Sequence, residues 1–276
     1  ENKNGTSAAK NARIADKTFK FTLVRTINFM KIITWNCNMA FRKKADVILS
    51  HQPDILIVQE CECPEKLLFS KVTKKPTDVL WFGNNQHKGL AIFSYGNYKL
   101  KVMDGHKRDI QLIVPVYVTN GETNFNLFAV WAHNPNDPDW QYVEQVWKAI
   151  HHYDNLLLPG KTILAGDFNS NTIWDRTHRV GNHSDVVKRL EERGICSAYH
   201  LHHQQMQGQE AHPTFYLYRH QLKPYHLDYC FVSADLAEQI QSVEIGDYDF
   251  WKQYSDHVPL MVTFQGSGSD KFILHP

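Results

Sequence analysis

Side chains that can bind a metal ion or transfer a proton stand where short apolar segments of this chain begin or end. A carboxylate in such a place costs desolvation free energy unless it is paired or bound to a metal. One such residue is ordinarily a turn or a cap, but the repetition along this chain indicates a common site. The pattern comprises Asn36, Glu60, His133, Asn134, Asp167, Asn169, His226, Asp228, Asp256 and His257.

The donors in this set are mostly carboxylate and amide oxygens, without a cluster of thiolates. Oxygen donors suit Mg²⁺ or Mn²⁺ better than zinc. A divalent ion, a carboxylate that orients water and histidines that stabilise an oxyanion together describe phosphoryl-group hydrolysis. The sequence therefore predicts a hydrolase that acts on phosphoric ester bonds with Mg²⁺, or Mn²⁺, as its cofactor.

Short apolar strands recur from Met30 onward, with helical stretches between them. Several strands follow one another after gaps of turn length, which favours antiparallel pairing over a doubly wound parallel sheet. The predicted class is α/β, with a sandwich-like core and helices outside it. The expected strands are 31–35, 54–59, 89–94, 111–118, 124–132, 161–166, 226–233, 239–246 and 258–264, and the expected helices are 138–155 and 183–193.

Five short motifs occur in a fixed order between Lys31 and Phe264, which is nearly the whole body of the chain. They are Thr34-Trp-Asn36, Pro53-Asp-Ile-Leu-Ile-Val-Gln-Glu60, Gly166-Asp-Phe-Asn169, His226-Leu-Asp-Tyr229 and Ser255-Asp-His257. Together they closely resemble the endonuclease/exonuclease/phosphatase superfamily, whose members have the fold of deoxyribonuclease I. Within it, the motifs are most similar to those of the bacterial exonuclease III-like members. The resemblance implies two stacked, largely antiparallel β-sheets flanked by helices in a four-layer sandwich.

The resemblance also implies three residues at the metal. Glu60 matches the principal metal ligand of the superfamily, and Asp256 matches a second ligand. Asn36 matches the asparagine that helps to place the metal or the phosphate.

Five further residues match catalytic positions. Asp167 matches the residue that orients or deprotonates the attacking water, and Asn169 matches its neighbour on the phosphate. His257 matches the catalytic histidine, which Asp228 orients. His133 falls where deoxyribonuclease I-like members have a histidine and abasic-site enzymes have a tyrosine.

One segment departs from the abasic-site members, which resemble Gly-Trp-Arg before the Leu/Ile-Asp-Tyr motif. This chain has Pro224-Tyr-His226 there, so phosphodiester cleavage is expected without a specific abasic-site activity. A nuclease is the favoured interpretation. The alternatives are a phosphoesterase acting on a phosphoinositide, a phospholipid headgroup or a nucleotide, and a catalytically dead binding protein.

Composition and charge limit how a nucleic acid would be bound. The chain has 276 residues, of which 42% are hydrophobic and 21% charged, as in globular proteins. Residues 1–29 hold six basic and two acidic side chains, a net +4, which leaves 24 basic and 27 acidic, a net −3, for the remainder. Residues 30–276 are therefore not broadly basic, so we expect a phosphate to be bound through a metal ion or a local patch of basic side chains.

The ends of the chain differ in composition from its centre. Residues 1–29 are polar and aperiodic, and we interpret them as a leader or extension outside a domain that spans 30–265. The Gly- and Ser-rich start of 266–276 indicates a flexible C-terminal tail. The five cysteines are odd in number and sparse, which favours a reducing compartment. We predict a cytoplasmic location, and we predict that the protein is a monomer. No apolar stretch approaches the ~18 residues of a membrane span.

A separate group of histidines comprises His200, His202, His203 and His212. Zinc binding is one interpretation. A loop is favoured, because no matching cysteine or carboxylate spacing accompanies the group.

Overall fold

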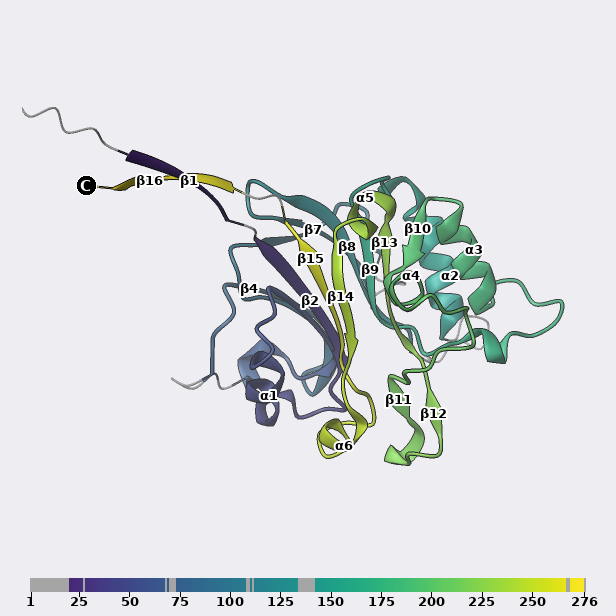
Figure 1. The fold of residues 1–276 in the computed structure, drawn as a ribbon. Helices are drawn as coiled ribbons and strands as arrows, with labels where there is room; N and C mark the ends of the chain where they lie inside the picture. The colour runs from purple at the N-terminus through teal and green to yellow at the C-terminus, as the bar shows by residue number, and fades with distance from the viewer. Residues whose placement is uncertain are drawn as a thin grey trace, which may run out of the picture. The chain divides into compact units, whose positions relative to one another are not determined.

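The computed structural model describes residues 20–26, 28–67, 69, 73–107, 110, 112–133, 142–266 and 269–275. The described residues form two compact units. One contains strands β1 (Lys20–Thr26) and β16 (Ser269–His275), and the other spans Phe29–Gly266. The larger unit contains two six-stranded sheets (Figure 1).

The first sheet carries Asn36 and Glu60 on neighbouring strands. Its central pair, β2 and β3, is parallel, while the outer pairs are antiparallel. In spatial order the strands are β14 (Ile240–Ile245), β15 (Leu260–Gln265), β2 (Phe29–Asn36), β3 (Ile55–Cys61), β5 (Lys88–Ser94) and β4 (Asp78–Asn85).

The second sheet repeats this arrangement and carries Asp167 and Asp228. Its central pair, β8 and β9, is parallel, and the outer pairs are again antiparallel. In spatial order the strands are β10 (Ile195–Ser197), β13 (Asp228–Ser233), β9 (Thr162–Asp167), β8 (Asn124–Trp131), β7 (Ile113–Thr119) and β6 (Lys99–Val102). The predicted largely antiparallel α/β sandwich is confirmed.

Three buried clusters hold the layers together. The largest lies between the sheets, where side chains such as Ile57 from β3 meet others such as Leu127 from β8. The second packs α2 (Val143–His152) and α3 (His183–Glu191) on the outer face of the second sheet. The third packs α1 (Ala45–Leu49) and α6 (Tyr248–Trp251) on the outer face of the first sheet (Figure 1).

Every strand predicted from the sequence is present, with small shifts at the ends. The predicted helix 138–155 is observed as α2, while its first four residues lie outside the described ranges. Strand β4 was not predicted, because it is a half-buried edge strand without clear alternation. The loop predicted for the histidine group is wrong for His200, His202 and His203, which lie in helix α4 (Ala198–His203), whereas His212 lies in the loop that follows.

The smaller unit consists of an antiparallel pair. Strand β1 pairs with β16 over seven residues, from Lys20 opposite His275 to Thr26 opposite Ser269. Neither strand is predicted from the sequence. Strand β2 begins at Phe29, directly after this unit.

Removing residues 1–28 together with 267–276 is expected to leave the larger unit folded and active. Both core clusters that β2 enters lie within 29–266, and the removed strands pair with each other. We expect the melting temperature to change by less than about 2 °C, which corresponds to about 1 kcal/mol or less in a domain of this size. Thermal unfolding and steady-state turnover of both forms check this, and a large fall in either would show that the removed segments support the larger unit.

Candidate active site

The strand ends carrying the predicted residues meet at one edge of the sandwich. In the parallel pairs, Asn36 lies opposite Gln59, and Trp131 lies opposite Asp167. Asp228, the first residue of β13, lies opposite Asp167, the last residue of β9. The sheet register therefore places the two aspartates side by side, although they are far apart in the sequence.

Gly166 permits the close strand packing that fixes Asp167. Its φ is +151°, and a Cβ built on it would lie 1.8 Å from the carbonyl oxygen of Val130 on β8. Any side chain here would push β9 away from β8, so glycine is required directly before the aspartate.

Asp167 is fully buried and held by three hydrogen bonds. Its Oδ2 accepts from the side-chain amides of Asn36, at 3.0 Å, and Asn169, at 2.9 Å, while its Oδ1 accepts from the backbone N–H of Asn169 at 2.9 Å. Burial raises the pKa of Asp167 above its ordinary value, and the nearby Asp228 acts in the same direction. A carboxylate so held is fixed in orientation and more basic than one in water.

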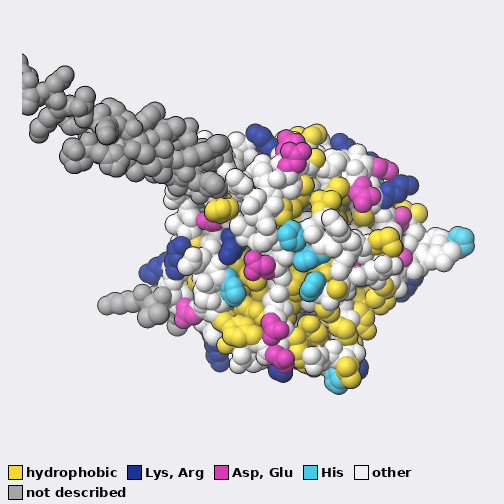
Figure 2. Space-filling view, in the orientation of Figure 1, with side chains coloured by type: hydrophobic (Ala, Val, Ile, Leu, Met, Phe, Trp, Pro, Cys, Tyr) yellow, Lys and Arg dark blue, Asp and Glu magenta, His cyan; other side chains and the backbone are white. Residues whose placement is uncertain are grey.

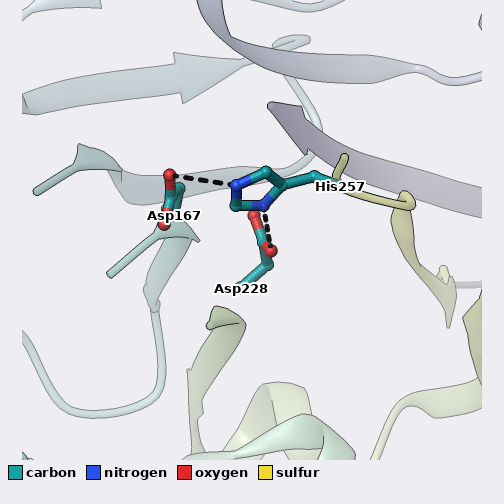
Figure 3. A group of neighbouring side chains, drawn as sticks. All are labelled: Asp167, Asp228 and His257. Carbon is teal, nitrogen blue, oxygen red and sulfur yellow. Dashed lines mark hydrogen bonds and ion pairs between the residues drawn. The ribbon is translucent and has the colours of Figure 1, made fainter. Parts of the chain in front are cut away.

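His257 lies between the two aspartates (Figure 3). Its Nδ1 is 2.8 Å from Oδ2 of Asp228, and its Nε2 is 4.0 Å from Oδ2 of Asp167. Burial alone would lower the pKa of His257, but the charges of Asp228 and Asp167 outweigh it and raise the pKa well above the ordinary value. The imidazolium form is therefore favoured at neutral pH, with an N–H left at Nε2 for a substrate.

Backbone and side-chain contacts hold His257 in place. Its carbonyl oxygen accepts from the indole N–H of Trp35 at 3.0 Å, and its N–H donates to the hydroxyl of Ser255 at 3.1 Å. The same hydroxyl donates to the carbonyl oxygen of Asn36 at 2.7 Å. The Ser-Asp-His segment is thus tied to the end of β2.

Thr214 supports Asp228 and was not identified from the sequence. Its buried hydroxyl accepts the backbone N–H groups of Leu227, at 2.9 Å, and Asp228, at 3.0 Å. No motif marks a threonine this far from the residues it supports.

Thr214→Val is expected to lower the free energy of unfolding by roughly 2 kcal/mol, because two buried N–H groups lose their acceptor. Turnover should fall as well, since Asp228 is then less firmly placed. Thr214→Ser keeps the acceptor and should stay near the wild type in both respects. Urea unfolding and steady-state kinetics of the two variants check this; equal stability of the Val and Ser forms would contradict it.

Glu60 stands at an irregularity of β3, where the pairing with β5 is interrupted between Val58 and Cys61. Its φ is +60°, a left-handed conformation that is costly for a glutamate and typical of constrained functional positions. Oε1 of Glu60 is 3.1 Å from Nζ of Lys88. Glu60, Lys88, His133 and Asn169 line one cavity of about 480 Å³.

Asp256, the second predicted metal ligand, contacts the segment that follows β2. Its Oδ1 accepts from the side-chain amide of Asn38 at 2.8 Å and from Ser255 at 3.3 Å. Asn38 also donates its backbone N–H to Oδ1 of Asn36 at 3.1 Å, which links Asp256 to Asn36. Asn38 was not predicted, although it lies two residues beyond the first motif.

The donor set fits a hard divalent cation. In the described part of the chain, Oε2 of Glu60 and Oδ2 of Asp256 have no hydrogen-bond partner, so each carboxylate keeps one oxygen available. Mg²⁺ needs only one or two protein carboxylates, since it retains several waters. The oxygens of Glu60 and Asp256 are thus suitable ligands.

A tighter group is less suited to a metal. Among the described residues, Asp167, Asp228 and His257 are the only three potential metal-binding side chains whose ligand atoms all lie within 4.8 Å of one another. An imidazolium carries a proton on each nitrogen and cannot ligate, and Nδ1 of His257 is already paired with Asp228. We therefore interpret these three residues as a proton-transfer unit, while Glu60 and Asp256 lie outside that group.

His133 follows β8 and lies at the cavity with Glu60. Its ring contacts Trp131 edge-on, with 5.4 Å between centroids. Burial lowers its pKa below the ordinary value, and the charge of Lys88 acts in the same direction. A neutral His133 can donate or accept a hydrogen bond at this cavity.

The comparisons with known proteins agree with this geometry. A model of the endonuclease/exonuclease/phosphatase family matches residues 33–257. The chain belongs to this family. Its members are phosphoester hydrolases, so both the predicted family and the predicted enzyme class are confirmed.

Three solved structures show the same fold at low sequence identity. A 3′-5′ exonuclease from Neisseria meningitidis has a TM-score of 0.64 and 21% identity, over 86% of this chain and 100% of that one. An AP endonuclease from Archaeoglobus fulgidus has a TM-score of 0.65 and 20% identity, over 85% and 99%. A Neisseria 3′ phosphatase bound to a product DNA hairpin has a TM-score of 0.62 and 20% identity, over 85% and 99%. No curated protein compared with the chain matches it significantly.

In this member of the endonuclease/exonuclease/phosphatase family, His226 is structural. It is buried, its Nδ1 lies 2.8 Å from the carbonyl oxygen of His212, and burial lowers its pKa to about 4. Its ring packs on Tyr199 at 4.5 Å, among the histidines of α4. His200 of that helix pairs with Glu210 at 3.0 Å. Three members of the histidine group, His200, His203 and His212, contact the ring of Tyr199 and contribute to the packing at α4, whereas His202 is exposed.

Proposed function

We propose that this chain is a divalent-metal-dependent phosphodiesterase that cleaves nucleic acid. The observation that carries the proposal is the buried unit of Asp167, His257 and Asp228. In this unit the carboxylate of Asp167 faces the imidazole of His257, and the pKa of each group lies above its ordinary value. Family membership supplies the reaction class.

Asp167 is proposed to accept a proton from the attacking water. The amides of Asn36 and Asn169 fix the carboxylate, and its raised pKa brings its basicity closer to neutral pH. His257 is proposed to donate a hydrogen bond or a proton from Nε2 to the developing phosphorane or the leaving oxygen. Asp228 keeps the ring charged and oriented.

Glu60 and Asp256, with Asn36, are proposed to hold Mg²⁺ or Mn²⁺. When bound, the ion would supply positive charge that stabilises the oxyanion of the transition state. Asn169 and His133 are proposed to bind phosphate oxygens, since both line the cavity next to Glu60.

Nucleic acid is the favoured substrate because two open cavities adjoin the catalytic residues. The first is the cavity of Glu60, and the second, of about 370 Å³, shares Asn169 and Tyr142 with it. Lys and Arg side chains are scattered around the rim of the face seen in Figure 2, without a broad basic field over it. Such a surface requires local contacts to each phosphate.

The test is hydrolysis of single-stranded DNA, duplex DNA, RNA and phosphoinositides, each with Mg²⁺, with Mn²⁺ and with EDTA. Metal-dependent cleavage of a nucleic acid supports the proposal. Turnover of phosphoinositides alone would favour the small-phosphoester function, and absence of metal-dependent hydrolysis on every substrate would overturn the proposal.

The setting in which the protein acts is also proposed. All five cysteines are free thiols, which is compatible with the reducing cytoplasm. Among the described residues, no helix is long and apolar enough to cross a membrane. We propose a cytoplasmic monomer in which residues 30–265 act as the catalytic domain.

A further inference from the structure

The second cavity lies directly beside the catalytic residues. It has a volume of about 370 Å³, and its lining includes Tyr142, Asn169, Trp174, Arg176, Arg179 and His183. Asn169 donates to Asp167 and also lines the cavity of Glu60. A ligand that occupies both cavities therefore passes Asn169, which holds the carboxylate proposed to activate water.

An exposed tryptophan forms one wall of this cavity. Trp174 is 47% exposed, which is unusual for so large an apolar ring, and it contacts Tyr225 at 4.9 Å between centroids. Tyr225 contacts Phe215 at 6.3 Å, and Phe215 contacts His257 at 4.6 Å. The rings thus form a row from the catalytic histidine to the partly exposed Trp174.

The turn that carries Trp174 is rigidly anchored. Asn171, which is buried, caps the turn by accepting the N–H of Ile173 at 3.1 Å. Its amide donates to the hydroxyl of Tyr229 and to the carbonyl oxygen of His226, each at 3.1 Å. The backbone turn that carries Trp174 is therefore held in place before a ligand arrives, which lowers the entropy cost of binding on it.

Arg176 supplies a positive charge to the same cavity. The carboxylate of Asp175 accepts hydrogen bonds from the backbone N–H groups of His183 and Ser184. Arg179, the other arginine of the cavity, is paired with Glu144. No ion pair to Arg176 is found within the described ranges, and its side chain is exposed. The cavity thus combines an exposed aromatic ring with one cation, Arg176, for which no ion pair is found among the described residues.

From this combination we infer that the cavity binds an unpaired nucleotide next to the scissile phosphate, with its base on Trp174 and its phosphate at Arg176. A base inside a duplex has both faces covered by its neighbours, so an aromatic wall selects single-stranded or terminal bases. The inference rests on the proposed function and extends it by naming single-stranded nucleic acid as the substrate class.

The test compares the full chain with Trp174→Ala, Trp174→Phe and Arg176→Gln. Tyr117→Ala serves as the matched control, because Tyr117 is an exposed ring on β7 that lines neither cavity. Substrates are a single-stranded oligonucleotide, the same sequence as a blunt duplex, and methyl p-nitrophenyl phosphate, which carries no base.

Trp174→Ala is expected to lower kcat/KM on the single strand by about 10-fold or more, the usual loss for one stacked base. Trp174→Phe should retain most of the activity, and the base-free diester and the control variant should be unaffected. Arg176→Gln should weaken binding of the single strand and reduce the slope of log Kd against log salt by about 0.7, as for one lost phosphate contact.

Three results would overturn the inference: an unchanged kcat/KM of Trp174→Ala on the single strand, an equal loss on the base-free diester, or an equal loss on the duplex. Binding of the labelled single strand by fluorescence anisotropy tests the cavity without turnover. Inactivity of the wild type on every diester would overturn the proposed function, whereas normal cleavage with unchanged binding by Trp174→Ala would overturn the nucleotide site alone.

Discussion

Replacing His257 by Ala is expected to lower kcat by about 10²–10⁴-fold, the usual range for a positioned acid or base. The Nδ1 of His257 is paired with Asp228, and its Nε2 lies 4.0 Å from the carboxylate proposed to activate water. Substrate affinity should change far less than turnover. Steady-state kinetics and oligonucleotide binding of the variant separate the two effects.

Asp228→Asn is expected to impair the same step, because it removes the charge that favours the imidazolium. The double variant Asp228→Asn/His257→Ala should be little slower than His257→Ala, since residues that act as one unit show non-additive losses. If the two single losses instead multiply, Asp228 acts separately from His257, most simply at the metal.

The pH dependence of kcat distinguishes this pairing from a merely structural role. Asp228 and Asp167 raise the pKa of His257 above 6.5, the ordinary pKa of histidine. In the wild type His257 should therefore stay protonated, and the enzyme active, well above pH 6.5. Asp228→Asn removes a negative charge, lowers that pKa and should move the alkaline limb of the profile to lower pH. An alkaline limb that stays in place would show that His257 is not the acid.

The central strands were predictable because their signal is local. Strands such as β3 and β9 are short apolar runs ended by polar residues, and burial on both faces requires that composition. Strand β4 lies at a sheet edge and is only half-buried, so its sequence shows no clear alternation of apolar and polar side chains. The pairing of β1 with β16 depends on contacts between opposite ends of the sequence, which no local pattern encodes.

The motif residues were predictable because each stands at a strand end, but their supports were not. Thr214 holds Asp228 through backbone N–H groups, and Lys88 pairs with Glu60 across a strand pair. Neither contact imposes a recognisable spacing. A loop was favoured for the histidines of α4 because no matching cysteine or carboxylate spacing accompanies them. In the structure they lie on a helix, where His200 and His203 contact the ring of Tyr199.

Glu60→Gln is expected to lower kcat/KM by at least about 10²-fold while preserving the fold, because the proposed metal loses its principal anionic ligand. Gln has nearly the same size, and the left-handed backbone at this position is no more costly for it than for Glu. Weakened binding of Mn²⁺, measured by calorimetry, should accompany the loss. Raising the metal concentration should restore part of the activity, since an amide oxygen remains a weak ligand.

Glu65→Gln is the matched control, since Glu65 is an exposed glutamate on the turn after β3 and lines neither cavity. It should show wild-type metal binding and turnover. Near wild-type activity of Glu60→Gln at subsaturating Mg²⁺ would remove Glu60 from the metal site. In that case its strained backbone and its pairing with Lys88 would point to a structural role at the cavity wall, and Asp256 would become the principal carboxylate to test.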